Sequence, residues 1–174
     1  SLWQGKYLYD LYEIASTPWD WHAELFEYSR KLGIEPFSTP FDLTAVDFLE
    51  QLDVQRYKVA SFEITYLELI AKIAQTSKPM IISTGMSNLA EVYEAVEAIK
   101  SVGNIDIVVL QCNTDYPSKI EDSNILAMNT MKEQRIPANR PITRDRHLWM
   151  MNKSMSLQMK ECLAKQRIQV QGLP

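Results

Sequence analysis

The sequence contains few cysteines and few histidines, and both shortages limit the chemistry that it can perform. Its 174 residues include two cysteines, Cys112 and Cys162, which are too few for a disulfide framework. We therefore expect a reducing compartment, with the cytoplasm as the default. The histidines are His22 and His147. His22 falls within a predicted helix, where we expect a solvent-facing side chain rather than a metal ligand.

Long apolar runs and clusters of basic residues are also missing. The longest apolar runs fall well short of a membrane span, and no signal peptide opens the chain. The net charge of -4, without a Lys/Arg run, disfavours a nucleic-acid-binding surface. The composition is 46% hydrophobic and 23% charged, which is typical of a globular domain with its own core. We expect no membrane partner and no nucleic-acid partner.

Four short strand-like segments each end in a small polar cluster. They are residues 34–39, 57–63, 80–85 and 108–114. Helix-patterned segments separate them, at a spacing of roughly 22 to 28 residues that is typical of repeated βα units. Parallel strands bring their carboxyl ends to one face, which is where barrel enzymes perform their chemistry. The hydroxyls, one lysine and one carboxylate of these clusters therefore predict an anion-binding pocket that holds an acid or base.

The helix pattern gives the limits of the elements between these strands. Residues 10–32 are predicted helical in two pieces, with Thr17 as cap and Pro18 in the first turn of the second piece, and Gly33 as its stop. Further helices are predicted from Asp42 or Thr44 to Leu52, over 64–76, over 88–102 with Ser87 or Asn88 as cap and Gly103 as the stop, and over 123–134.

The regular pattern ends after Glu133, where the chain becomes polar and loses its period. We therefore predict one α/β domain over residues 1–134 and a degenerate tail over 135–174. A closed (β/α)8 barrel takes about 250 residues. The repeats alone therefore indicate either an open α/β sheet or part of a larger barrel.

Six motifs follow one another over roughly residues 3 to 134. They are LYDLYE at 8–13, TPW at 17–19, FSTPFD at 37–42, YKVASFEI at 57–64, KPMIISTGM at 78–86 and CNTDYP at 112–117. In this order and spacing they resemble the sialic acid synthase family, which contains the N-acetylneuraminate, pseudaminic and legionaminic acid synthases. Residues 44–50 and 61–64 are most similar to the pseudaminic acid synthase branch. The resemblance implies an incomplete (β/α)8 TIM barrel with about four to five βα units.

The resemblance also implies an activity. The family condenses phosphoenolpyruvate with an N-acetylated amino sugar in its aldehyde form, and the products are a nine-carbon sialic-acid-type sugar and phosphate. The same resemblance assigns the binding of phosphoenolpyruvate to Thr39, Lys58, Ser61, Ser83 and Thr114. It makes Glu63 the catalytic acid or base and Tyr116 a contact of the amino sugar.

The residue types suit this chemistry. Phosphoenolpyruvate carries two anionic groups, so a fixed cation and hydroxyl donors offset its loss of hydration. Proton transfer needs a positioned acid or base, and Glu63 supplies a carboxylate at the end of the motif that contains Lys58 and Ser61. Simpler roles stay open: Lys58 as a solvated lysine, Glu63 as a helix-start carboxylate and Ser83 as part of a plain turn. Asn113 is the alternative to Thr114.

The chain departs from the family pattern in ways that affect its metal and its partner. The family uses a divalent metal, Mn²⁺ or Mg²⁺, and forms a homodimer in which a small antifreeze-like domain caps the partner's active site. The family's metal histidines have no counterpart here, and Pro141 aligns with one of them. The capping domain also has no counterpart. The alternative function is therefore a catalytically inactive remnant that acts at most as an association module. Open sheet edges and apolar helix faces would favour self-association.

Overall fold

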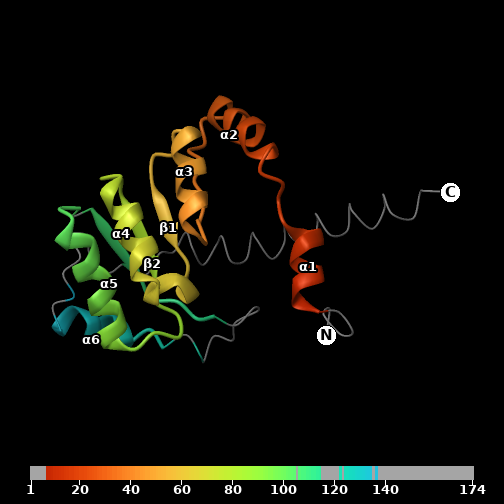
Figure 1. Ribbon diagram of the computed structural model, residues 1–174. Helices are drawn as coiled ribbons and strands as arrows, with labels where there is room; N and C mark the ends of the chain where they lie inside the picture. Colours follow the sequence, from red (N-terminus) through yellow and green to blue (C-terminus); the bar gives the residue numbers. More distant parts are fainter. Residues whose placement is uncertain (1–6, 105, 115–121, 123, 135, 137–174) are drawn as a thin grey trace.

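The structure is an α/β arrangement built on one parallel sheet (Figure 1). The computed structural model describes residues 7–104, 106–114, 122, 124–134 and 136. The elements, in chain order, are α1 (Leu8–Ala15), α2 (Trp21–Lys31), α3 (Leu43–Gln51), β1 (Tyr57–Val59), the 3-10 helix η1 (Ser61–Thr65), α4 (Leu67–Gln75), β2 (Met80–Ser83), α5 (Leu89–Ser101), β3 (Ile107–Leu110) and α6 (Ala127–Glu133). Strands and helices alternate from β1 onward, so the predicted α/β class is confirmed.

The sheet has the order β1-β2-β3, and its strands run parallel. Tyr57 pairs with Met80, which in turn pairs with Ile107. A helix connects each strand to the next, as in the βα repeat of a barrel. The carboxyl ends of the three strands therefore meet at one edge, where the predicted site residues follow β1, β2 and β3.

One face of the sheet is completely buried against the helices. The strand residues on this face have no exposed surface: Tyr57, Val59, Met80, Ile82, Ile107 and Val109. They join the core residues of α4 and α5 in one hydrophobic cluster. The residues between them, Lys58, Ile81 and Val108, are only half-buried. Because side chains alternate along a strand, Lys58 lies on the more open face.

The helix ends follow the predicted capping chemistry. Asp42 caps α3, since its Oδ1 accepts the Ala45 N–H at 2.8 Å. Asn88 caps α5 in a reciprocal capping box with Glu91. Gly33 and Gly103 end α2 and α5 with φ of 73° and 88°, a left-handed conformation that glycine adopts without steric cost.

The strand predicted at residues 34–39 is wrong, since this segment has no regular secondary structure. Among the described residues, one backbone hydrogen bond connects it to the sheet, from the Lys58 N–H to the Ser38 carbonyl at 3.4 Å. Pro36 lies within the segment and Pro40 directly after it. Proline has no N–H to donate, so a continuous ladder with β1 cannot form. The structure therefore shows three βα strands in its described residues, fewer than predicted.

The start of α2 also differs from the prediction. The helix begins at Trp21 with Asp20 at the N-cap position, rather than with Thr17 as cap and Pro18 in the first turn. The Pro18 carbonyl accepts the Trp21 N–H at 3.2 Å, so a turn precedes the helix. His22 is half-buried rather than solvent-facing. Its ring lies 5.4 Å from that of Phe48 in an edge-on contact.

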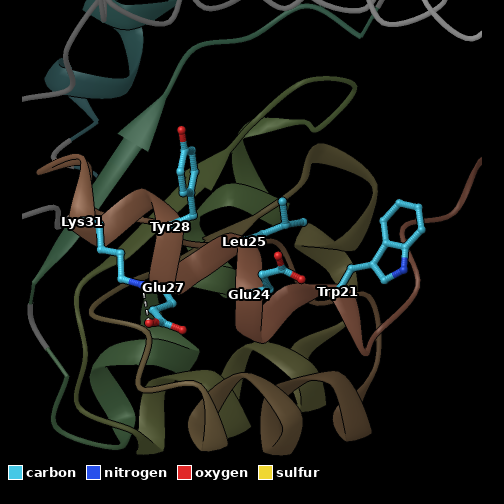
Figure 2. A pocket seen from close by; sticks show the side chains of 6 residues that line it. All are labelled: Trp21, Glu24, Leu25, Glu27, Tyr28 and Lys31. Carbon is cyan, nitrogen blue, oxygen red and sulfur yellow. Dashed lines mark ion pairs between the residues drawn. The ribbon is translucent and has the colours of Figure 1, made fainter.

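The aromatic residues of this region divide between packing and exposure. Trp19 stacks on Phe48 with ring centroids 4.5 Å apart. Trp21, Leu25 and Tyr28 are 59%, 49% and 62% exposed. Figure 2 shows their side chains projecting outward from α2. The expected exposure of apolar helix faces is thus confirmed, whereas self-association stays a prediction.

The outer surface of α2 has a shallow hollow of about 440 Å³ (Figure 2). All its lining residues belong to this one helix: Trp21, Glu24, Leu25, Glu27, Tyr28 and Lys31. Lys31 and Glu27 form an exposed ion pair at 2.6 Å along the hollow, and such pairs contribute little to stability.

Two expectations concern the chain as a whole. Within the described ranges, no helix is long and apolar enough to cross a membrane. The predicted tail, residues 135–174, lies outside the described residues apart from Ile136. The division of the chain at residue 134 therefore stays a prediction.

Candidate functional site

Lys58 and Glu63 form the charged part of the site at the carboxyl end of β1. The strand ends at Val59, earlier than predicted, and the chain turns at once into η1. This turn brings the Glu63 carboxylate back toward the strand end. Its Oε2 is buried and has no hydrogen-bond partner among the described residues. An unpaired buried carboxylate oxygen is costly for folding, so it is a feature that function explains better than stability.

Burial changes the proton affinity of both charged groups. It lowers the pKa of Lys58, and negative charge at Cys112 and Glu63 partly opposes this change. Burial likewise raises the pKa of Glu63, opposed by its own backbone N–H and then by the charge of Lys58. The two side chains therefore interact electrostatically in a partly desolvated setting. Perturbed pKa values of this kind gather at functional sites.

Ser61, Gly85 and Thr114 bring three strand ends into close contact. The Gly85 N–H donates to Ser61 Oγ at 3.1 Å. A Cβ on Gly85 would lie 2.8 Å from Ser61 Oγ and 2.7 Å from Thr114 Cγ2, which is closer than real Cβ atoms approach. The structure thus brings together the predicted residues Ser61 and Thr114, although 53 positions separate them in sequence (114 − 61).

The end of β2 holds the next predicted residue, Ser83. Ser83 is 3% exposed and pairs with Leu110 in the last position of the β2–β3 ladder. Beyond it, the Thr84 N–H and hydroxyl both donate to the Leu110 carbonyl, at 3.1 and 2.9 Å. These two hydrogen bonds to one carbonyl fix the end of β2 against β3. Ser83 is therefore held firmly at the carboxyl edge.

Thr39 and Tyr116 are less firmly placed. Thr39 is half-buried and follows Ser38, whose carbonyl accepts the Lys58 N–H, so its backbone lies beside β1. No hydrogen bond of the Thr39 hydroxyl is found within the described part of the chain. Tyr116 lies outside the described residues, and its assignment stays a prediction.

Cys112 lies beside the site rather than in the hydrophobic core. It is half-buried, and it lies beyond the end of β3, close enough to Lys58 to affect the pKa of that lysine. It also lines a cavity of about 590 Å³ between the carboxyl ends of β2 and β3 and the helices α5 and α6. Thr84, Asn113 and Thr114 line the same cavity, whereas Lys58 and Glu63 do not.

The described residues do not form a metal site. No group of three or more His, Cys, Asp and Glu side chains gathers anywhere in the described ranges. His22 is occupied elsewhere, with its Nδ1 3.1 Å from the Pro18 carbonyl. Glu63 and Cys112 are the potential ligands beside Lys58, and they are too few for a divalent ion. The divalent metal that the resemblance implies stays a prediction.

Sequence reasoning missed Thr84, Gly85 and Cys112 as parts of this site. The signal for Gly85 was its place directly after a strand and two hydroxyl residues, because glycine at a strand end often marks close approach of another backbone or side chain. The role of Thr84 had no such signal, since its partner Leu110 lies 26 residues away.

Comparisons with known proteins identify relatives of the same kind. The model of the NeuB family matches residues 1–137. A pseudaminic acid synthase of Helicobacter pylori is 49% identical over 133 residues, which are 76% of this chain and 39% of that protein. An N,N'-diacetyllegionaminic acid synthase of Campylobacter jejuni is 40% identical over 114 residues, 64% of this chain and 34% of that protein. The chain thus spans well under half the length of these relatives.

Solved structures share the fold. The sialic acid synthetase of Leptospira borgpetersenii, solved in complex with citrate, matches with a TM-score of 0.68 and 29% identity over 72% of this chain and 44% of that one. The spore coat protein SpsE of Bacillus subtilis matches with a TM-score of 0.67 and 28% identity, over 76% of this chain and 37% of that one. These matches confirm the barrel-type α/β fold and the predicted family resemblance. This chain belongs to the NeuB family.

Proposed function

We propose that this chain carries the phosphoenolpyruvate-binding part of a sialic-acid-type synthase. The complete reaction would join phosphoenolpyruvate to an N-acetylated amino sugar aldehyde, and it would yield a nine-carbon sugar acid and phosphate. The observation that carries the proposal is the partly buried pair of Lys58 and Glu63 at the carboxyl edge of the sheet. The names of the relatives, which are synthases of pseudaminic and legionaminic acids, support the same reaction class.

In this proposal the ammonium of Lys58 binds one anionic group of phosphoenolpyruvate. Hydroxyls of Ser61, Ser83 and Thr39 donate to its oxygens, and Thr114 closes the pocket from β3. A partly dehydrated cation binds an anion more strongly than a solvated one. The desolvation that lowers the pKa of Lys58 therefore also strengthens its attraction for the ligand.

Glu63 would exchange the proton that the condensation requires. Water replaces the phosphate in the overall reaction, so a proton must leave that water and a group must accept it. Burial raises the pKa of Glu63 toward the range in which a carboxylate accepts and returns protons. No described residue set holds a metal, so the proposal contains no step through one. A divalent metal, a homodimer, the contact of Tyr116 with the sugar and a cytoplasmic location belong to the proposal by family resemblance alone.

A second candidate is an association module without catalytic activity. The exposed Trp21, Leu25 and Tyr28 favour it, because apolar patches on a helix face promote association. Size-exclusion chromatography with light scattering tests this candidate. A monomer at micromolar concentration would contradict it, and a dimer that Trp21→Glu dissociates would support it.

Calorimetric titration of phosphoenolpyruvate into the purified chain, with and without Mn²⁺, tests the first candidate. We expect saturable binding that Lys58→Ala abolishes. Lys72→Ala is the matched control, since Lys72 lies on α4 and pairs with Asp47 at 2.7 Å. Absence of binding in a cooperatively folded sample would reject the proposal and leave the association module.

A further inference from the structure

The contact between Gly85 and Ser61 connects the end of β2 to the start of η1. The Gly85 N–H donates to Ser61 Oγ at 3.1 Å, so one lone pair of this oxygen is occupied. Among the described residues, the Ser61 hydroxyl proton has no acceptor. A hydroxyl that receives a hydrogen bond becomes a better donor itself, because hydrogen bonds in a chain polarise one another.

The contact depends on the missing side chain of Gly85. A Cβ there would meet Ser61 Oγ at 2.8 Å and Thr114 Cγ2 at 2.7 Å. Gly85 has no positive φ, so the backbone conformation alone would accept an alanine. Glycine is therefore required here because Ser61 and Thr114 approach its backbone closely, and not because the backbone adopts an unusual conformation.

The neighbours of Gly85 hold its backbone in place. The Thr84 N–H and hydroxyl bind the Leu110 carbonyl on one side. On the other side, the Ser87 N–H donates to the Thr84 carbonyl at 3.3 Å and closes a turn. Gly85 is thus a fixed donor, and the side chain of Ser61 must adjust to it.

We propose that Gly85 is a positioning residue for anion binding: its N–H holds Ser61 Oγ so that the hydroxyl proton is free for an oxygen of a phosphate or carboxylate ligand. This inference rests on the proposed function, and it adds a residue that acts through Ser61 rather than on the ligand. It predicts that a methyl group at position 85 rotates the side chains of Ser61 and Thr114 and leaves the fold intact. The two atoms nearer than 3.0 Å are ends of side chains, which can rotate, whereas Ser61 Cβ at 3.3 Å needs to move by only a few tenths of an ångström.

The test is a double-mutant cycle with phosphoenolpyruvate as the probe, measured by calorimetry on the 174-residue chain. We expect Gly85→Ala and Ser61→Ala each to weaken binding between about tenfold and about a hundredfold, as for a lost hydrogen bond to a charged group. In a Thr114→Ser background, which removes the second clashing atom, the double variant should bind no more weakly than Ser61→Ala, since Gly85 then acts through the Ser61 hydroxyl alone. Additive losses in the double variant would overturn the inference.

Gly103→Ala is the matched control. Gly103 has a φ of 88° with no atom near its missing Cβ, so alanine there should lower the melting temperature and leave phosphoenolpyruvate affinity unchanged. Gly85→Ala should instead leave the melting temperature unchanged and weaken phosphoenolpyruvate binding. Unchanged affinity in Gly85→Ala, with wild-type binding intact, would reject the positioning role alone. A folded wild-type chain without binding would reject the proposed function and this inference with it.

A second variant covers the case in which Gly85→Ala folds poorly. Thr114→Ser removes Cγ2, the nearest clashing atom, and keeps the hydroxyl. In this background, we expect Gly85→Ala to fold normally and still to weaken phosphoenolpyruvate binding relative to Thr114→Ser. Loss of folding in both backgrounds would overturn the inference, because the backbone rather than Ser61 would then absorb the clash.

Discussion

At the end of β1, the Glu63 carboxylate raises the pKa of Lys58, and the Lys58 ammonium lowers the pKa of Glu63. Burial has the opposite and larger effect on each group: it lowers the pKa of Lys58 and raises that of Glu63. Each group is therefore harder to charge in the folded chain than in the unfolded one, and both charges lower the stability of the fold near neutral pH. Such a pair is retained where binding or catalysis needs it.

The first prediction concerns Lys58→Met. Phosphoenolpyruvate affinity should fall at least about tenfold, because the ligand loses its cation. The melting temperature near neutral pH should not decrease, since a partly buried charge is replaced by an apolar side chain of similar length. Lys72→Met is the control, and it should lose at most about 1 kcal/mol from its ion pair. Unchanged ligand affinity in Lys58→Met would contradict the site assignment.

The second prediction is a pH dependence caused by Glu63. Its pKa is higher in the folded chain than the ordinary value of 4.5, so the folded state binds more protons between the two values. The contribution of Glu63 to stability is therefore complete below the ordinary pKa and is lost as the pH rises through the raised one.

Glu63→Gln should remove this dependence. The melting temperature of the variant relative to the wild type should rise as the pH increases from below the ordinary pKa of Glu63 through its raised value. Glu68→Gln, at an exposed position of α4, is the matched control in the same buffers. A constant difference across this range would show that Glu63 titrates in the folded chain as it does in the unfolded one.

Local chemistry made some features predictable and left others hidden. The caps Asp42 and Asn88 and the stops Gly33 and Gly103 follow from short-range rules, and each was predicted, alone or as one of two alternatives. The extent of the strands did not follow, because alternation of apolar residues does not show which backbone donors find a partner. Segment 34–39 has the residue pattern of a strand and no ladder.

The site was predictable in its residue types more than in its contacts. Lys58, Ser61, Glu63 and Ser83 were selected from motifs that each belong to one strand end, and the parallel sheet brings those ends together. The bond from Gly85 to Ser61 joins residues 24 positions apart. No local pattern specifies such a contact, since it depends on the register of β1 against β2.

The third prediction addresses the amino ends of the strands, opposite the candidate site. Tyr57, the first residue of β1, is fully buried, and its hydroxyl donates to Glu50 Oε1 at 2.6 Å. Lys78 Nζ also donates to Glu50 Oε1, at 2.7 Å. Tyr57→Phe should cost about 1 to 3 kcal/mol of unfolding free energy, because Glu50 loses a buried donor.

Tyr57→Phe should leave phosphoenolpyruvate affinity unchanged, since Tyr57 lies at the amino end of its strand, away from the candidate site. Urea unfolding and calorimetry on the same samples measure the two effects. Tyr93→Phe is the control, because Tyr93 is 48% exposed on α5 and should change stability by less than about 0.5 kcal/mol. A loss of affinity in Tyr57→Phe would show that the amino and carboxyl ends of the strands are energetically coupled.

The fourth prediction decides between two caps of α5 that the sequence could not separate. Asn88 Oδ1 accepts the N–H groups of Ala90 and Glu91 at 2.9 and 3.1 Å, and Glu91 Oε2 accepts the Asn88 N–H at 2.8 Å. Asn88→Ala should therefore cost about 1 kcal/mol in urea unfolding. Ser87→Ala should cost less, because the hydroxyl makes one long hydrogen bond of 3.5 Å to the Gly85 carbonyl.

Glu91→Ala completes the test, because the two halves of a capping box depend on each other. The double variant Asn88→Ala/Glu91→Ala should lose less stability than the sum of the single variants, since each substitution already weakens the partner's hydrogen bond. Strict additivity would mean that the two bonds act separately. A larger loss in Ser87→Ala than in Asn88→Ala would move the cap by one residue, and with it the start of the helix that follows Gly85.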